Sequence, residues 1–238
     1  MRSWQEFWDG DTTTYVNRRH LEAHYSRLLT DVAPLLPAPP ATVLDFGCGE
    51  ALMAPELAKA GWTVLLYDTA PNRQRQLAER YGAIERITVL DDAAFAALPP
   101  GSCDAVFAIS VIQYIERPAL SGVVARLSRL LRPSGRLLLA DVIPPRSGML
   151  QDVWSLLAFA LRHGFLLAAL GWLLHACRSD YRSLRGRLGL TTWETDDLAG
   201  VLVGAGLKAE VLPDNVGENP NRMTLVGYPA RVAALLHL

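Results

Sequence analysis

The stretch VLDFGCGE, residues 43–50, decides the fold. Its first four residues are mostly apolar, as in a strand buried within a sheet, and its two glycines permit a tight turn. Residues 50–60 then have a helical pattern that Gly61 ends. A strand, a glycine turn and a helix in this order predict the junction at which α/β proteins bind nucleotide-like ligands.

Two positions at this turn discriminate between such ligands. A dinucleotide site needs a third glycine three residues after the second, and that position is Leu52. Asp45 stands just before the turn, where its carboxylate would repel a pyrophosphate and attract an ammonium group. Both positions argue against a nicotinamide-dependent oxidoreductase. They favour a cofactor with adenosine at one end and an amino acid at the other, which describes S-adenosylmethionine.

Composition sets limits on the class of protein. The chain has 238 residues, half of them hydrophobic, which suffices for one sizeable domain with an insertion. Its formal net charge of −1 provides no overall positive field for nucleic acid. The three cysteines are widely spaced, and residues 1–6 lack the pattern of a signal peptide. We therefore expect a cytoplasmic protein that does not bind nucleic acid.

Strands and helices alternate through most of the chain, after a helix at 14–36 that the run PAPP, residues 37–40, ends. The expected strands are 42–46, 62–67, 86–90, 103–109, 136–142, 207–212 and 222–228, and the expected helices are 50–60, 71–81, 92–98, 117–131 and 195–205. Repeated β-α units of this length form parallel sheets with right-handed crossovers. We expect an α/β fold: a Rossmann-like, doubly wound, mostly parallel seven-stranded sheet with an N-terminal helix and a helical insertion before the last α/β unit.

The same pattern divides the chain into three parts. Residues 1–40 are expected to form an N-terminal helical cap. Residues 41–143 and 191–238 are expected to form the α/β core, and residues 144–190 an apolar helical insertion or lid.

Polar residues follow several of the expected strands, at the sheet edge where α/β proteins bind ligands. Asp68 ends the second strand, about 20 residues past the glycine turn, where an acid can bind ribose hydroxyls. Either Asp91 or Asp92 could accept from an adenine amino group, with Ala93 offering its backbone N–H, and we favour Asp92. Gln113 and Tyr114, after the fourth strand, could contact cofactor or substrate.

These features together resemble the class I methyltransferases that use S-adenosylmethionine, and within them a small-molecule subgroup that includes quinone-biosynthesis methyltransferases. The stretches that carry the resemblance are VLDFGCGEA, the strand end at Asp68, CDAVFAISVIQYIE and LSRLLRPSGRLLLADV. The resemblance covers residues 41–143 and reappears in the final strands. It implies contacts to methionine at Asp45, Gly47 and Gly49, to ribose at Asp68, and to adenine near Asp92 and Ala93. The segment after Asp92 is longer than is usual in that family.

The candidate site residues fall into two groups. The cofactor-binding candidates are Asp45, Phe46, Gly47, Cys48, Gly49, Asp68, Thr69, Asp92, Ala93, Ile109, Ser110 and Gln113. The catalytic candidates are His20 and His24, one turn apart on the first long helix, and Tyr114; His163 and His175 are further histidines in the insertion. Tyr15 and Tyr25 could cover the cofactor. No aspartate-rich metal constellation is apparent, so we expect no metal.

The insertion contains two uncharged runs, 153–161 and 164–174, separated by Arg162 and His163. Each run is shorter than the roughly 20 residues that span a bilayer. Joined as one span they would place Arg162 near its centre, at a cost of about 3 kcal/mol, so a transmembrane helix is disfavoured. Four arginines follow, at positions 178, 182, 185 and 187. The insertion is therefore open to three interpretations: a lid, a homodimer interface, or a peripheral contact of residues 150–187 with the inner face of a membrane.

The sequence thus predicts an S-adenosylmethionine-dependent methyltransferase that modifies an O or C atom of a hydrophobic small molecule, such as a phenol, quinone precursor, terpenoid or lipid. The alternative is a non-catalytic regulatory or interaction protein that binds S-adenosylmethionine or S-adenosylhomocysteine.

Overall fold

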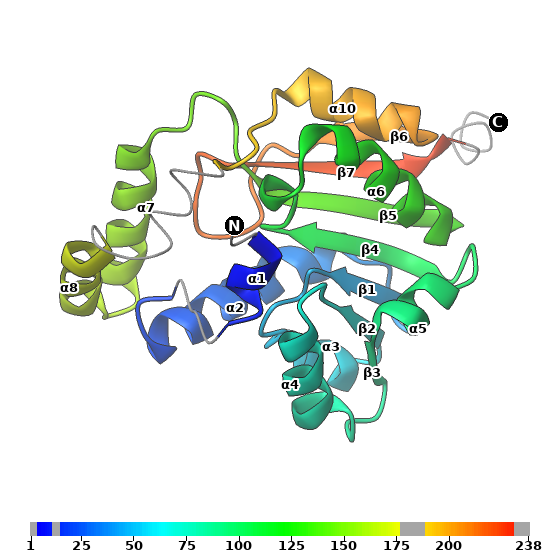
Figure 1. Cartoon of the computed structure of the whole chain (residues 1–238), viewed down its shortest axis with the longest axis horizontal. Coiled ribbons are helices and arrows are strands. Elements are labelled where there is room, and N and C mark those ends of the chain that lie inside the picture. Colours follow the sequence, from blue (N-terminus) through cyan, green and yellow to red (C-terminus); the bar gives the residue numbers. More distant parts are fainter. Residues whose placement is uncertain (1–3, 11–14, 177–188, 231–238) are drawn as a thin grey trace.

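The computed structural model describes residues 4–10, 15–176 and 189–230. Its centre is a seven-stranded sheet in the order β3-β2-β1-β4-β5-β7-β6 (Figure 1). The strands are β1 (Thr42–Phe46), β2 (Thr63–Tyr67), β3 (Ile87–Leu90), β4 (Cys103–Ile109), β5 (Leu131–Val142), β6 (Leu207–Val211) and β7 (Met223–Pro229). The first five run parallel, and β7 is antiparallel to both β5 and β6. This confirms the predicted mostly parallel, doubly wound sheet.

The order of strands places a ligand site. The chain winds outward from β1 through β2 to β3 and then crosses back to β4 on the other side of β1. Parallel sheets bind ligands outside the carboxyl ends of the strands at such a reversal, because the loops there diverge. The glycine turn that follows β1 lies at this point.

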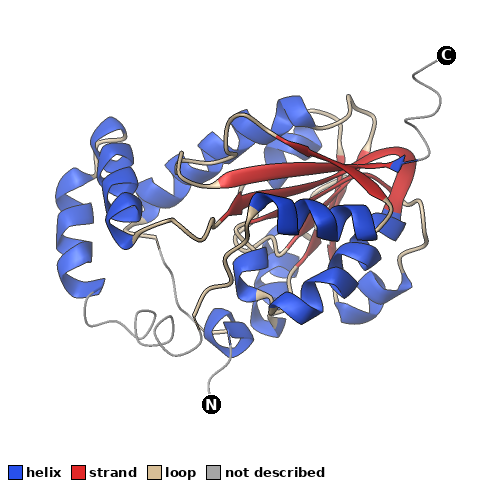
Figure 2. Ribbon diagram, turned by 90° about the horizontal axis from the view of Figure 1, so that it is seen from above, coloured by secondary structure: helices blue, strands red, loops and turns tan. Residues whose placement is uncertain are grey.

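Helices cover both faces of the sheet (Figures 1 and 2). One face packs against α2 (Arg18–Val32), α3 (Ala54–Lys59) and α4 (Pro71–Tyr81); the other packs against α5 (Asp92–Ala97), α6 (Arg117–Leu130) and α10 (Thr195–Gly204). Successive strand residues alternate between the two layers: Val43 lies on the α2 side and Leu44 on the α6 side, and neither is exposed. Strands apolar on both faces are what a sheet covered by helices on each side requires.

Several helix boundaries differ from the prediction for local reasons. The first long helix begins at Arg18 because the Asn17 side chain caps it by accepting from the His20 N–H, and it ends in the short helix η1 (Ala33–Leu35). The helix after the glycine turn begins at Ala54 rather than at residue 50. Residues 50–53 form turns there, with Ala51 at φ +52°.

The apolar segment of the insertion folds as two helices, α7 (Met149–Arg162) and α8 (Leu166–Ala176). Gly164 has φ +74°, a left-handed conformation that ends α7 and turns the chain back. Phe159, Ala160, Phe165 and Ala169 form a small core between the two helices. The pair stands to one side of the sheet, next to α2 (Figures 1 and 2). Among the residues described, no helix is both long and apolar enough to cross a bilayer.

Candidate active site

A cavity of about 550 Å³ lies at the carboxyl ends of the central strands, a volume in the range of small-molecule sites. One end is formed by the glycine turn and the ends of β1, β2 and β4. The other end is formed by α2, the end of β5 and the loop between β6 and β7. The short helix α1 (Trp4–Trp8) contributes Trp4, Gln5 and Trp8 to the lining. The described residues that line the cavity are Trp4, Gln5, Trp8, Tyr15, His20, His24, Tyr25, Leu28, Asp45, Phe46, Gly47, Cys48, Gly49, Glu50, Met53, Asp68, Thr69, Arg73, Ile109, Ser110, Val111, Gln113, Tyr114, Ile115, Val123, Asp141, Ile143, Leu190, Glu218 and Arg222.

The glycine turn wraps around the end of β2. The backbone N–H groups of Gly47 and Cys48 both donate to the carbonyl oxygen of Tyr67, at 2.8 and 3.2 Å. Gly47 has φ +74°, and a Cβ there would lie 2.5 Å from a methyl carbon of Val111. The turn can therefore take this conformation beside Val111 only because the residue is glycine.

Asp45, at the end of β1, is 6% exposed and lines the cavity. Its carboxylate accepts no hydrogen bond from any residue that the structure describes. Burial raises its pKa well above the ordinary value, and the nearby charge of Asp68 adds to the effect. Burying an ionised carboxylate without a partner costs free energy, unless a cation or a hydrogen-bond donor binds to it. The cavity at Asp45 thus fits the ammonium group of an amino-acid ligand.

Asp68, at the end of β2, is held in a fixed position. Its two carboxylate oxygens accept from the N–H groups of Gly49, at 3.1 Å, and Ala70, at 3.0 Å. Burial raises its pKa, while these two hydrogen bonds act in the opposite direction. The carboxylate therefore borders the glycine turn on the side where a ribose would lie.

The two residues predicted to contact adenine, Asp92 and Ala93, are not among the described residues that line the cavity. Asp92 accepts from the hydroxyl of Tyr67 and the amide of Gln74, both at 3.0 Å. Asp91 caps α5 by accepting from Ala94 N–H at 2.7 Å. Both carboxylates thus have structural partners where the sequence suggested an adenine contact.

The end of β4 contributes Ile109, Ser110, Gln113 and Tyr114 to the cavity lining. Ser110 has φ +58° and its hydroxyl donates to Asp141 Oδ2 at 2.5 Å; Asp141 itself has φ +55°. Two adjacent strand ends in left-handed conformations are the kind of strained backbone that gathers at functional sites. Asp141 is not among the residues predicted from the sequence, because nothing in its local sequence distinguishes it from other strand-end acids.

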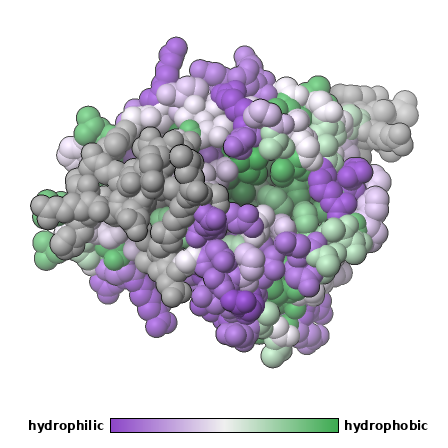
Figure 3. Space-filling model, viewed as in Figure 1, coloured by the Kyte–Doolittle hydropathy of each residue, from purple (hydrophilic) through white to green (hydrophobic). Residues whose placement is uncertain are grey.

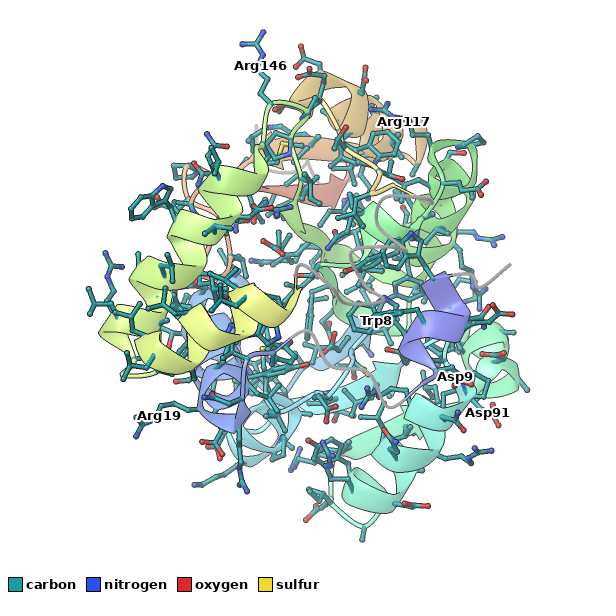
Figure 4. All side chains as sticks on the ribbon, turned by 60° about the vertical axis from the view of Figure 1, so that its left-hand side comes forward. Trp8, Asp9, Arg19, Asp91, Arg117 and Arg146 are labelled. Atoms are coloured by element: carbon teal, nitrogen blue, oxygen red, sulfur yellow. The ribbon has the colours of Figure 1, made fainter. Side chains whose placement is uncertain are left out.

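Three aromatic side chains, Trp4, Trp8 and Tyr114, pack together at one side of the cavity. The Tyr114 ring packs against Trp4 at 4.9 Å and Trp8 at 5.5 Å, centroid to centroid, both from α1. Gln5 donates to the carbonyl of Thr69 at 2.8 Å, and Asp9 accepts from the backbone N–H of Asn72 at 2.6 Å. The two α1-side residues labelled Trp8 and Asp9 in Figure 4 thus lie where α1 joins the core.

The opposite end is built from residues far apart in the sequence. His20 and His24 lie on one turn of α2, and Glu218 reaches them from the loop before β7. His24 Nδ1 is 2.6 Å from Glu218 Oε2, and His20 Nε2 is 3.8 Å from Glu218 Oε1. Sequence reasoning could not pair His24 with Glu218, since 194 positions separate them.

Tyr25 connects the two ends. Its hydroxyl donates to the carbonyl of Cys48 at 3.3 Å and accepts from the N–H of Glu50 at 3.0 Å, so α2 is fixed directly to the glycine turn. His24 precedes Tyr25 on the same helix. The helix that carries His24 is therefore hydrogen-bonded to the glycine turn through Tyr25.

The remaining candidates stand apart from these groups. His163 is exposed at the end of α7, with its ring 4.2 Å from that of Phe159. The side chain of His175 and the four arginines at 178, 182, 185 and 187 lie outside the described residues. Within the described ranges no cluster of three His, Cys, Asp or Glu side chains could hold a metal ion.

The chain matches a known protein family and several of its characterised relatives. A family model described as a methyltransferase domain matches residues 17–177, more than half of the chain. The ubiquinone biosynthesis O-methyltransferase of Xanthomonas campestris pv. campestris is 30% identical over 141 residues, covering 57% of this chain and 56% of that protein. The nocamycin O-methyltransferase of Saccharothrix syringae is 36% identical over 155 residues, covering 57% of this chain and 54% of that protein. The chain thus aligns with about half the length of these curated relatives.

Solved structures share the fold. The magnesium protoporphyrin IX methyltransferase from Synechocystis, with bound S-adenosylmethionine, superposes with a TM-score of 0.55 at 17% identity, covering 94% of this chain and 87% of that one. PigF with S-adenosylhomocysteine superposes with a TM-score of 0.62 at 15% identity, covering 95% of this chain and 62% of that one. At such identities the likeness concerns the fold alone.

Proposed function

The chain belongs to the methyltransferase-domain family, and from that premise we propose that it transfers the methyl group of S-adenosylmethionine to an oxygen atom of an apolar small molecule. One observation carries the proposal above all. The unpaired, buried carboxylate of Asp45 lies in the same cavity as the glycine turn and Asp68, which together suit an amino acid joined to a ribose.

The residues of this end would share the work of holding the cofactor. Asp45 would accept from its ammonium group, and the backbone of Phe46, Gly47, Cys48 and Gly49 would surround its methionine part. Asp68 and Thr69 would face the ribose, and Ile109, Ser110 and Gln113 would border the reacting end. Once bound, S-adenosylmethionine supplies a methyl group on a positively charged sulfur, so the protein's main task is to align the acceptor for in-line attack.

The walls of the cavity support an apolar acceptor. Trp4, Trp8 and Tyr114 offer aromatic surface on one side. Polar groups at the other side, His20, His24 and Glu218, supply acid–base chemistry, which an O–H acceptor needs more than an already nucleophilic sulfur or amine does. Two named relatives are O-methyltransferases. Methylation of an acidic carbon is the second outcome that these residues allow.

We further propose that α7 and α8 bring this site to an anionic bilayer surface. Six of the nine large hydrophobic residues exposed among those described lie on this pair: Leu150, Trp154, Leu161, Leu167, Leu170 and Leu174. Green atoms show at the left-hand edge of the molecule in Figure 3, on the side where α7 and α8 lie. Arg19 and Arg146 lie at opposite ends of the pair (Figure 4). An apolar helix face flanked by arginines suits the interface of a membrane that contains acidic lipids.

Vesicle co-sedimentation tests this contact. We expect the wild type to bind vesicles of phosphatidylglycerol and phosphatidylcholine, and Leu167→Asp with Leu174→Asp to abolish binding. Val203→Asp, at a residue 62% exposed on α10, is the matched control and should bind as the wild type does. If the wild type does not bind vesicles but forms a concentration-dependent dimer, this face is instead a homodimer interface.

Label transfer tests the main proposal. The protein is incubated with methyl-labelled S-adenosylmethionine and with either the organic-phase or the aqueous-phase fraction of a cell extract. We expect label in small molecules of the organic phase, and about tenfold less with the Asp45→Ala variant at a cofactor concentration below saturation. Tight binding of S-adenosylhomocysteine without label transfer to either fraction would favour the non-catalytic alternative. Label confined to the aqueous fraction would contradict the apolar acceptor.

A further inference from the structure

The carboxylate of Glu218 joins two histidines that line the proposed acceptor end of the cavity. It faces His24 Nδ1 through Oε2, at 2.6 Å, and His20 Nε2 through Oε1, at 3.8 Å. The side chains of His24 and Glu218 are 14% and 21% exposed, so water screens this interaction weakly. The arrangement suits an acid–base unit better than a surface ion pair.

The hydrogen bonds fix which ring nitrogen of each histidine carries a proton. The backbone N–H of Val16 donates to His20 Nδ1 at 3.1 Å, so that nitrogen is an acceptor and the ring proton of neutral His20 sits on Nε2, facing Glu218. Glu218 likewise accepts from His24 Nδ1–H. Neutral His24 therefore keeps its lone pair on Nε2. This is the nitrogen of His24 that remains for a ligand in the cavity.

Only one of the two histidines is open to an acceptor. His20 is 6% exposed, its ring stacks on Phe165 at 5.0 Å, and its Nε2 is buried. Tyr15, the neighbouring phenol, stays protonated because burial and the charge of Glu218 raise its pKa far above neutrality. Of the two histidines, His24 is thus the one with a ring nitrogen left for an acceptor.

The charges around His24 raise its pKa, which makes the neutral imidazole a stronger base. Burial lowers the pKa of His24, but the charge and hydrogen bond of Glu218 outweigh that effect and raise it overall. Burial acts to raise the pKa of Glu218, yet the two histidines hold it well below the ordinary value. The titratable and charged groups around this cluster are His20 and Tyr25 on α2, Tyr15 before it, Asp141 after β5, and Glu218 and Arg222 before β7.

We propose that His24 is the general base of the methyl transfer, that Glu218 holds its Nδ1–H, and that His20 positions Glu218. The assignment rests on the proposed function. In the reaction, the acceptor O–H proton passes to His24 Nε2 and the oxygen lone pair forms the O–CH₃ bond. The electron pair of the S–CH₃ bond stays on sulfur, and His24 later releases its proton to solvent. In this assignment Glu218 and His20 act through His24, so both are positioning residues.

A histidine NMR titration of the full chain, with S-adenosylhomocysteine bound, tests the tautomer and needs no acceptor. We expect neutral His24 to carry its proton on Nδ1, and its titration to move to lower pH in Glu218→Gln. His163→Gln, which removes an exposed histidine of α7, should leave that titration where it was. Neutral His24 protonated on Nε2, or a titration unmoved by Glu218→Gln, would overturn the assignment.

Rates measured with the acceptor fraction from the label-transfer experiment complete the test. His24→Gln should lower kcat by about 100-fold or more and leave S-adenosylhomocysteine affinity within about twofold. Glu218→Gln should lower kcat by about tenfold and move the acidic limb of the pH–rate profile to lower pH. An active His24→Gln enzyme with an unchanged pH profile would refute the base while leaving the methyltransferase intact. A wild type that binds no S-adenosylhomocysteine would instead overturn the proposed function itself.

Discussion

The two ends of the cavity are built in different ways. The cofactor end consists of strand ends and one glycine turn, held by backbone hydrogen bonds such as those from Gly47 and Cys48 to Tyr67. The acceptor end consists of side chains from α2, the end of β5 and the loop before β7, and it is supported by packing contacts such as the stacking of His20 on Phe165. A site made of backbone tolerates little change, whereas one made of side chains can be altered without moving the sheet. We therefore expect variants to separate cofactor binding from acceptor chemistry.

The largest effect should come from Gly47→Ala at the cofactor end. The new Cβ would lie 2.5 Å from Val111 Cγ2 in a backbone conformation with positive φ, so the turn would relax away from its binding shape. We expect S-adenosylhomocysteine affinity to fall about 100-fold, or about 2.7 kcal/mol, in calorimetry. Gly122→Ala on α6, where a Cβ meets nothing within 4 Å, is the control. Equal affinity in both variants would mean that the ligand does not approach this turn.

Removal of either acid of the cofactor end should reduce S-adenosylhomocysteine affinity somewhat less than Gly47→Ala does. Asp45→Ala and Asp68→Ala should each weaken S-adenosylhomocysteine binding by about tenfold or more, about 1.4 kcal/mol. The histidine titration of the acceptor end should not change. Asp91→Ala removes an acid that only caps α5, so it should leave affinity unaltered. Full affinity in both cavity variants would refute the assigned cofactor end.

The contrast between the ends also explains what could be predicted from sequence. The glycine turn, Asp45 and Asp68 are local signals, because a strand followed by a tight turn presents the same groups wherever it occurs. The His24–Glu218 contact depends on how a loop before the last strand folds back onto the first long helix, and no local pattern encodes that. Asp92 illustrates a third case: its place after a strand predicts an adenine contact, and the structure shows that its Oδ1 accepts from Tyr67 and Gln74, which no local pattern indicates.

Tyr25→Phe probes the connection between the two ends. It removes the hydroxyl that bridges Cys48 and Glu50 and leaves the Glu50 N–H without that partner. A lost hydrogen bond of this kind costs about 1 kcal/mol, so we expect S-adenosylhomocysteine affinity and kcat each to fall about fivefold. A change confined to one of the two quantities would show that α2 does not couple them.

The smallest effect is a pH dependence of stability at the acceptor end. The folded-state pKa of His24 lies above its ordinary 6.5, so its contribution is present below pH 6.5 and lost as pH rises through the folded value. The folded-state pKa of Glu218 lies below its ordinary 4.5, so its contribution is present above pH 4.5 and lost as pH falls. The destabilisation by Glu218→Gln should therefore be greatest between about pH 4.5 and 6.5 and smaller, by about 1 kcal/mol or less, at pH 9. Denaturant unfolding of the wild type and Glu218→Gln at pH 6 and pH 9 measures this loss in the free energy of unfolding. A loss that is the same at both pH values would contradict the ion pair.

Calorimetric titration of the wild-type chain with S-adenosylhomocysteine and, separately, with NAD tests the central claim most directly. The unpaired Asp45 carboxylate and the absence of a third glycine at Leu52 predict saturable one-site binding of S-adenosylhomocysteine and no measurable binding of NAD. Tight binding of NAD without binding of S-adenosylhomocysteine would contradict the account.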